Sequence, residues 1–232
     1  MVSTRSKIIH SLAFFIAAFF GLSSPVQAQK LLGEAELITA LKQGGHAIYL
    51  RHAETDVSTT DQDRDDLSDW TKQRNLSEKG RQQAVAIGKA FRALGIPVSE
   101  IKASPYCRCV ETAKLAFGKV TVNADLAFSI GTEKREAERL ADALRIMLGT
   151  QPPTGKNTVL IAHTANLQEA AKIWPKPEGV AFIFKPLGNK SFELVQRVEV
   201  QQWAQLAQKV GVTITEDKQT SQLAERKMLC GT

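Results

Sequence analysis

The sequence contains no run of five lysine or arginine residues, no internal repeat and only three cysteines among its 232 residues. Without a basic block it lacks the usual signature of a protein that binds nucleic acid or anionic lipid. Hydrophobic residues make up 43% of the chain and charged residues 23%. A chain of this length and composition can bury the core of one globular domain, which excludes a disordered or collagen-like protein.

The longest apolar run lies at the amino terminus and is short for a membrane span. It covers residues 8–22, follows the basic residues Arg5 and Lys7, and leads into small and polar residues up to Ala28. This pattern predicts a secretory signal peptide over residues 1–28, and hence a periplasmic or secreted protein without stable membrane insertion after cleavage. An uncleaved signal anchor is the alternative.

The three cysteines cannot all pair within one chain, so one thiol is left over. Cys107 and Cys109 are too close in sequence to bridge each other without strain. In an oxidising compartment, either of them could form a disulfide with Cys230.

Apolar runs typical of strands alternate with helical patterns along residues 29–210, and a polar tail is predicted over residues 211–232. Strands are predicted at 47–50, 100–103 and 158–162, helices at 34–42, 77–94, 104–117, 132–148 and 166–173, and an edge hairpin at 180–185 and 192–198. The alternation predicts one α/β domain with a mostly parallel sheet that helices cover on both faces.

Basic side chains and imidazoles follow the predicted strands. The first strand ends in Arg51 and His52, the second leads into a helix that carries Arg108, and the third ends at His163. Ligands of such folds bind beyond the carboxyl ends of parallel strands, so these four side chains are expected to face one crevice. Two guanidinium groups in a partly desolvated crevice repel each other unless an anion lies between them. The formal charge of +4 for residues 29–232 suits an anionic ligand.

A phosphoryl group is the anion that fits this set best. The guanidinium fork matches two phosphate oxygens, and the free N–H groups of the helix that begins near Pro105 add positive potential. A neutral imidazole can attack phosphorus and form a phosphohistidine, while the arginines stabilise the charge of the transition state.

Four sequence blocks carry these residues. They are Leu50-Arg51-His52-Ala53-Glu54-Thr55, Asn75-Leu76-Ser77-Glu78-Lys79-Gly80, Ser104-Pro105-Tyr106-Cys107-Arg108-Cys109-Val110-Glu111-Thr112-Ala113 and Ile161-Ala162-His163-Thr164. In their order and spacing they resemble the histidine phosphatase superfamily of phosphoglycerate mutase-like and acid-phosphatase-like enzymes. The resemblance implies a phosphoglycerate mutase-like fold and no cofactor or metal. It also implies that His52 is the phosphorylated nucleophile, and that Arg51, Arg108 and His163 are catalytic residues that bind phosphate and stabilise its transfer.

The family commonly uses a carboxylate to protonate the leaving alcohol, and the sequence offers candidates after the third block. Glu133 is predicted as this acid, with Glu136 close by. The alternative is that an acid in the first turn of a helix only complements the helix dipole. The chain also departs from the family pattern, because Ala53 replaces the usual glycine and Ala162 and Thr164 flank the second histidine without one.

The polar segment 54–75 is rich in aspartate. A calcium-binding loop that starts at Asp61 is excluded, because Asp66 and Lys72 occupy the positions of the required glycine and glutamate. We expect a solvated lid over the crevice instead, with Arg74 at its far end binding a substrate phosphate.

These features predict an exported phosphomonoesterase that releases inorganic phosphate through a phosphohistidine. Its partner is expected to be a small phosphorylated substrate or a phosphoglycan, such as an envelope sugar phosphate, and not nucleic acid. One alternative is a non-catalytic module that binds phosphate or phosphoglycan. The other is a phosphohistidine-protein phosphatase. The sequence predicts no particular oligomeric state.

Overall fold

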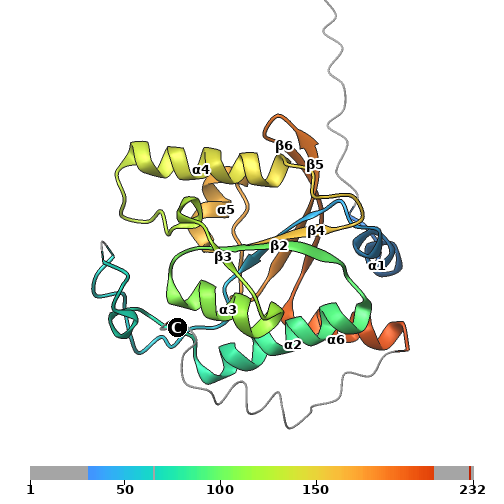
Figure 1. Ribbon diagram of the computed structural model, residues 1–232, viewed down its shortest axis with the longest axis horizontal. Coiled ribbons are helices and arrows are strands. Elements are labelled where there is room, and N and C mark those ends of the chain that lie inside the picture. Colours follow the sequence, from blue (N-terminus) through green and yellow to red (C-terminus); the bar gives the residue numbers. More distant parts are fainter. Residues whose placement is uncertain (1–30, 65, 212–229, 231–232) are drawn as a thin grey trace, which may run out of the picture.

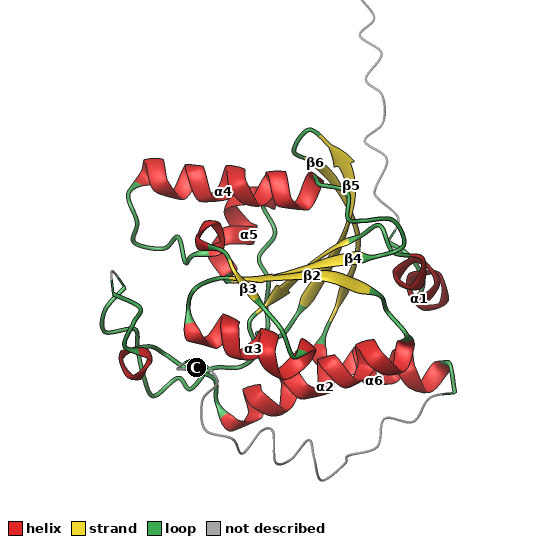
Figure 2. Cartoon of the chain, in the orientation of Figure 1, coloured by secondary structure: helices red, strands yellow, loops and turns green. Residues whose placement is uncertain are grey.

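The computed structural model describes residues 31–64, 66–211 and 230 and shows one six-stranded sheet with helices on both faces (Figures 1 and 2). The strand order is β3-β2-β4-β1-β5-β6. The strands are β1 (Ala47–Arg51), β2 (Val98–Ala103), β3 (Thr121–Val122), β4 (Asn157–Ala162), β5 (Ala181–Gly188) and β6 (Ser191–Val198). Strands β1 to β4 are parallel, whereas β5 and β6 run antiparallel at one edge. The predicted fold class is confirmed.

The helices form two layers. They are α1 (Glu34–Gln43), α2 (Glu78–Leu94), α3 (Cys107–Phe117), α4 (Lys134–Gly149), α5 (Thr164–Ala171) and α6 (Val200–Lys209). Figure 1 shows α2, α3 and α6 below the sheet and α4 and α5 above it. Among the described residues, no helix is long and apolar enough to span a bilayer. The predicted signal peptide and most of the predicted tail lie outside the described residues.

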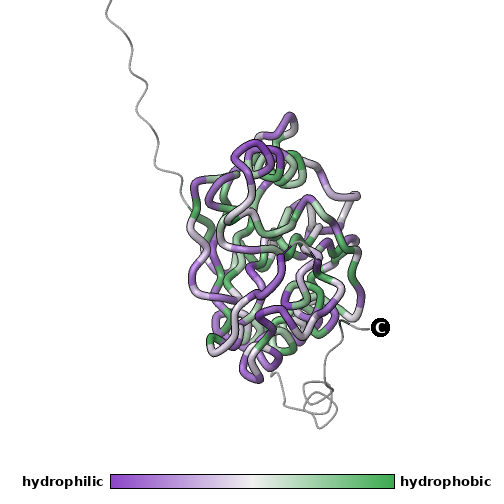
Figure 3. The backbone as a smooth tube through the Cα atoms, turned by 90° about the vertical axis from the view of Figure 1, so that its left-hand side faces the viewer, coloured by the Kyte–Doolittle hydropathy of each residue, from purple (hydrophilic) through white to green (hydrophobic). Residues whose placement is uncertain are grey.

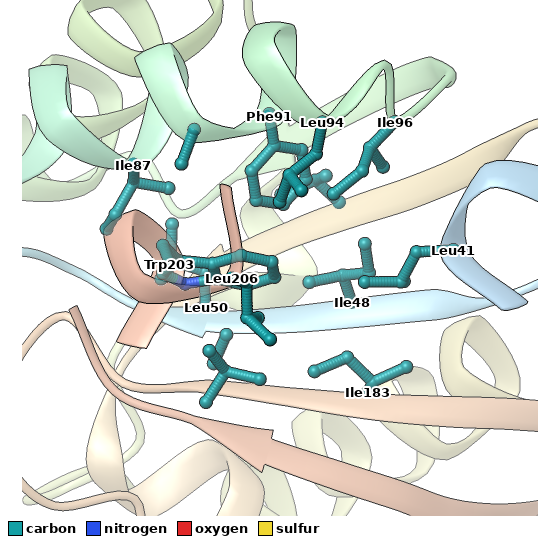
Figure 4. Close-up of a cluster of buried hydrophobic side chains, with 14 of the residues drawn as sticks. Leu41, Ile48, Leu50, Ile87, Phe91, Leu94, Ile96, Ile183, Trp203 and Leu206 are labelled. Atoms are coloured by element: carbon teal, nitrogen blue, oxygen red, sulfur yellow. The ribbon is translucent and has the colours of Figure 1, made fainter. Parts of the chain in front are cut away.

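The sheet buries opposite faces of each central strand in two separate cores, as the period of two along a strand requires. Ile48 and Leu50 of β1 belong to the core between the sheet and helices α2 and α6. In this core Phe91 packs on Trp203 with ring centroids 4.7 Å apart (Figure 4). Tyr49 joins the core on the α4 and α5 side. Figure 3 shows hydrophobic stretches in the middle of the molecule and hydrophilic ones at many outer turns. Because both faces are covered, the only accessible part of these strands is their ends.

Strand β3 is absent from the sequence predictions, and two helices differ from them. Helix α6 is absent from the prediction, although Glu199 and Gln202 form a capping box at its start and Trp203 is 1% exposed. Only three residues of this Gln-rich helix form its buried apolar stripe, so the sequence pattern does not indicate a helix there. The prediction that Asn166 begins α5 is wrong: His163 is the N-cap, and Asn166 Nδ2 donates to the Ala127 carbonyl at 2.7 Å.

The start of α2 rests on the backbone that follows β1. Ser77 caps the helix by accepting a hydrogen bond from Gly80 N–H at 3.0 Å, and its own N–H donates to the Glu54 carbonyl at 3.0 Å. A Cβ atom on Gly80 would overlap the same carbonyl. The glycine of the second sequence block is therefore needed for close contact with the chain two residues beyond His52.

We expect Gly80→Ala to lower the free energy of unfolding by about 1–3 kcal/mol, because the added methyl group meets backbone atoms that cannot rotate away. Urea unfolding measures this change. Gln82→Ala, at an exposed position of the same helix, is the matched control and should stay within about 0.5 kcal/mol of the parent. Equal stability of the two variants would contradict the close contact.

Candidate active site

The carboxyl ends of three neighbouring strands open into a cavity of about 290 Å³. Since β2, β4 and β1 are adjacent in the sheet, the residues that follow them come together at one edge. The lining residues are Arg51, His52, Thr60, Asp61, Arg64, Arg74, Arg108, Phe128, Ile130, His163, Thr164, Trp174 and Lys176. Five of them are cationic and one is acidic, so the cavity is built for an anion.

His52 lies directly after β1 and is 2% exposed. Its Nδ1 lies 2.9 Å from the Ala53 carbonyl oxygen, which can only accept a hydrogen bond. Nδ1 therefore carries the proton of the neutral imidazole, and Nε2 holds a free lone pair. Burial and the nearby Arg108 guanidinium hold the pKa of His52 well below its usual value of 6.5. At neutral pH the residue is uncharged, which is the form that can attack phosphorus.

His163 lies at the end of β4, and its ring centroid is 5.4 Å from that of His52. Its Nε2 shares a 2.7 Å hydrogen bond with the Ser104 hydroxyl from the end of β2, and the Tyr49 hydroxyl donates to its backbone carbonyl. Burial and Arg108 also keep the pKa of His163 well below 6.5. The second imidazole is thus neutral, with its ring oriented by Ser104 and its backbone bound by Tyr49.

Arg108, in the first turn of α3, is the most deeply buried cation of the site, with 1% exposure. Its Nη1 and Nη2 atoms donate to the two carboxylate oxygens of Asp61 at 2.8 and 3.3 Å. The guanidinium also lies over the Tyr106 ring, 4.4 Å from its centroid. This fork geometry is the one in which arginine binds two oxygens of a phosphate group.

Two further arginines share one carboxylate behind the cavity. Arg51 Nη2 and Arg74 Nη2 lie 2.9 and 3.4 Å from Glu178 Oε1. Glu178 also accepts hydrogen bonds from the Thr55 N–H and hydroxyl at 2.9 and 3.0 Å. The Glu178 carboxylate thus orients both guanidinium groups and reduces their mutual repulsion.

The structure brings together five of the six predicted site residues. Arg51, His52, Arg74, Arg108 and His163 all line the cavity. Glu133 does not: it is the exposed N-cap residue of α4. The catalytic and phosphate-binding roles of these residues stay predictions.

Several residues of the site are not predicted from the sequence, among them Asp61, the acid that lines the cavity. Arg64, Lys176 and Phe128 also lie at the cavity, and Glu178 lies behind it. No pattern separates Asp61 from the other aspartates of the 54–75 segment. Glu178 lies 14 residues after the fourth block, beyond α5 and an irregular segment, so its contact with Arg51 depends on the fold.

The cysteines lie beside the site but supply no nucleophile. Cys107 forms a disulfide with Cys230, one of the two pairings that the sequence left open. The remaining Cys109 is buried, with Sγ 3.6 Å from His163 Nε2. Burial raises the pKa of the Cys109 thiol to about 12, which keeps it protonated and unreactive at neutral pH.

We expect the folded protein to lose stability as the pH falls from about 6.5 to 5. Unfolded histidines have a pKa near 6.5, so the unfolded chain binds protons in this range. The buried imidazoles of His52 and His163 stay neutral in the folded protein, and the protons therefore stabilise the unfolded state. Each imidazole contributes up to about 1.4 kcal/mol per pH unit. Urea unfolding at pH 7.5, 6 and 5 should therefore show a steeper loss for the parent than for His163→Gln. Equal slopes would contradict the burial of a neutral His163.

Comparison with known proteins agrees with this geometry. Residues 48–128 match the family model "Histidine phosphatase superfamily (branch 1)". No curated protein sequence matches the chain.

Solved structures similar to this chain include three phosphatases. The protein histidine phosphatase SixA complexed with tungstate is 11% identical, with 68% of this chain and 98% of that chain covered and a TM-score of 0.48. A mutant phosphoserine phosphatase from Entamoeba histolytica in complex with phosphoserine is 15% identical, with 67% and 98% covered and a TM-score of 0.48. A mycobacterial glucosyl-3-phosphoglycerate phosphatase is 19% identical, with 65% and 97% covered and a TM-score of 0.46.

The matched segment contains three of the four sequence blocks, and its residues Arg51, His52 and Arg108 lie in the cavity described above. The histidine phosphatase superfamily is therefore the family that residues 48–128 of this chain resemble.

Proposed function

We propose that this protein is an exported phosphomonoesterase that acts through a phosphohistidine on His52, with a phosphorylated envelope sugar as its substrate. The observation that carries the proposal is the pairing of a neutral, buried His52 with a buried Arg108 whose fork already holds an anion. A nucleophile and a phosphate-binding group are thus preorganised in one cavity, which is where most of the catalysis of phosphoryl transfer originates.

The reaction proceeds in two displacements. The phosphate oxygens of the substrate bind the guanidinium groups of Arg51, Arg74 and Arg108, and His52 Nε2 attacks phosphorus. The new N–P bond forms as the P–O bond to the alcohol breaks. Water then attacks the phosphohistidine, the N–P bond breaks, and inorganic phosphate leaves. The His163 imidazole lies beside His52 and can donate a hydrogen bond to a phosphoryl oxygen.

The mouth of the cavity supports a sugar phosphate as the substrate. Trp174 is 53% exposed, and Phe128 and Ile130 also line the cavity. Apolar and aromatic faces of this kind suit the C–H face of a sugar ring. Arg64 and Lys176 add positive charge at the same place, which favours a phosphoglycan over an uncharged glycan.

Two observations support export. The sequence begins with the pattern of a signal peptide over residues 1–28. The Cys107–Cys230 disulfide is of a kind that persists in oxidising compartments and is rare in the cytosol. Outside the cytosol, the phosphate esters at hand include envelope glycans and scavenged sugar phosphates.

His52→Ala should lower the rate of phosphate release from phosphomonoesters by a factor on the order of 10³ or more, because it removes the nucleophile. The measurement is phosphate release from a panel that includes sugar phosphates, at saturating substrate. His46→Ala, at the opposite end of the same strand, is the matched control and should stay within roughly twofold of the parent.

A parent protein that never exceeds His52→Ala on this panel would contradict the proposal. Binding of inorganic phosphate without turnover of any ester would instead indicate a non-catalytic phosphate-binding module.

A further inference from the structure

The Asp61 carboxylate occupies the guanidinium fork of Arg108. Its side chain is 7% exposed, and its two oxygens lie in the fork of Arg108 at 2.8 and 3.3 Å. The backbone N–H of Arg74 donates to the same carboxylate at 2.9 Å. Three donors that would suit phosphate oxygens are therefore satisfied by one aspartate. Since this fork holds one pair of oxygens at a time, a phosphate that binds the same two nitrogens of Arg108 displaces Asp61.

Displacement changes the chemical state of Asp61. Burial opposes the ionisation of Asp61, but the charge and hydrogen bonds of Arg108, with the Arg74 N–H and the charge of Arg64, together hold the pKa of Asp61 below its usual value of 3.8. Once Arg108 pairs with phosphate, Asp61 loses this partner and lies next to a second anion in a partly buried place. Both changes favour the protonated carboxyl group. The binding of substrate therefore converts Asp61 from a bound carboxylate into an acid.

The other candidates for a proton donor are poorly placed. Glu133 is exposed and does not line the cavity. Glu178 does not line the cavity, and its carboxylate is bound by Arg51, Arg74 and Thr55. Among the described residues that line the cavity, Asp61 is the only carboxylic acid.

We propose that Asp61 is the catalytic acid and base of this phosphatase, and that the substrate phosphate releases it for this role by displacing it from Arg108. The proposal rests on the phosphohistidine route through His52 given above. It assigns to the 54–75 segment the group that protonates the leaving alcohol.

The proton balance closes over the two displacements. A substrate that binds as the monoanion transfers its proton to the displaced Asp61 carboxylate. As His52 Nε2 attacks and the P–O bond breaks, Asp61 returns this proton to the alkoxide oxygen, and the alcohol leaves. The Asp61 carboxylate then takes a proton from the water that attacks the phosphohistidine. Asp61 can pass that proton to the departing phosphate and return to Arg108.

The test compares Asp61→Asn with the parent on two esters. An alkyl ester such as glycerol phosphate has a poor leaving group and needs the acid, whereas p-nitrophenyl phosphate has a good leaving group and does not. We expect Asp61→Asn to lower kcat for the alkyl ester by roughly 100-fold or more and kcat for p-nitrophenyl phosphate by less than tenfold. Asp61→Glu, which restores a carboxyl group, should recover part of the alkyl ester activity. Asp66→Asn, an exposed change in the same segment, should leave both rates unchanged.

A titration with inorganic phosphate tests the displacement independently of turnover. Asp61→Asn removes a charged competitor, so its Kd for phosphate should fall by roughly tenfold. An unchanged or weaker affinity would overturn the displacement. Equal losses on both esters, or none, would overturn the role of Asp61 as the acid.

These results are distinct from failure of the proposed function. If the parent hydrolysed neither ester, both the phosphohistidine route and the proton transfer would be wrong, while the phosphate titration would still decide the displacement. If the parent is active and His52→Ala is not, the ester comparison decides the role of Asp61 alone.

Discussion

The site depends on one constraint, which is that the guanidinium group of Arg108 is buried. A buried cation is stable only when an anion and hydrogen-bond acceptors replace the water it has lost. The fold places Arg108 in the first turn of α3, behind the end of β2, where it is 1% exposed. An anion is therefore required there in every state of the protein. Asp61 supplies it in the free protein, and phosphate supplies it when substrate is bound.

Burial, together with the positive charge of Arg108, keeps the two imidazoles neutral. His52 and His163 are buried beside Arg108, and both effects disfavour a further positive charge. A neutral imidazole is the reactive form of the nucleophile. Burial of Arg108 thus selects the ligand and also prepares His52 to attack it. Because Asp61 is paired with the same guanidinium group, Arg108 links substrate binding to proton transfer.

The sequence predicts the parts of the site that depend on local pattern. Arg51, His52 and His163 each follow a continuous apolar run, and such runs are long enough to be recognised as buried strands. Their convergence follows from the parallel topology, because carboxyl ends of parallel strands meet at one edge. The second block is explained once the structure shows that Gly80 touches the Glu54 carbonyl.

The parts that escaped prediction depend on how irregular chain folds back. Asp61 lies in a segment without periodicity, and only the three-dimensional path of that segment brings its carboxylate to Arg108. Glu133 has the residue type and approximate position of an acid, yet α4 begins where this side chain is exposed. The choice of Cys107 over Cys109 as the partner of Cys230 depends on which face of α3 each presents, because two residues, or about 200° of helix rotation, separate the disulfide-bonded cysteine from the buried thiol.

The central claim is that His52 forms a covalent bond to phosphorus in this cavity. The most direct measurement is mass spectrometry of the protein mixed with a phosphomonoester and quenched within milliseconds under conditions that preserve phosphohistidine. The account predicts a phosphate adduct on the peptide that contains His52 and none on the peptide that contains His163. Phosphate release without an adduct on His52, in a protein that turns over rapidly, would contradict it.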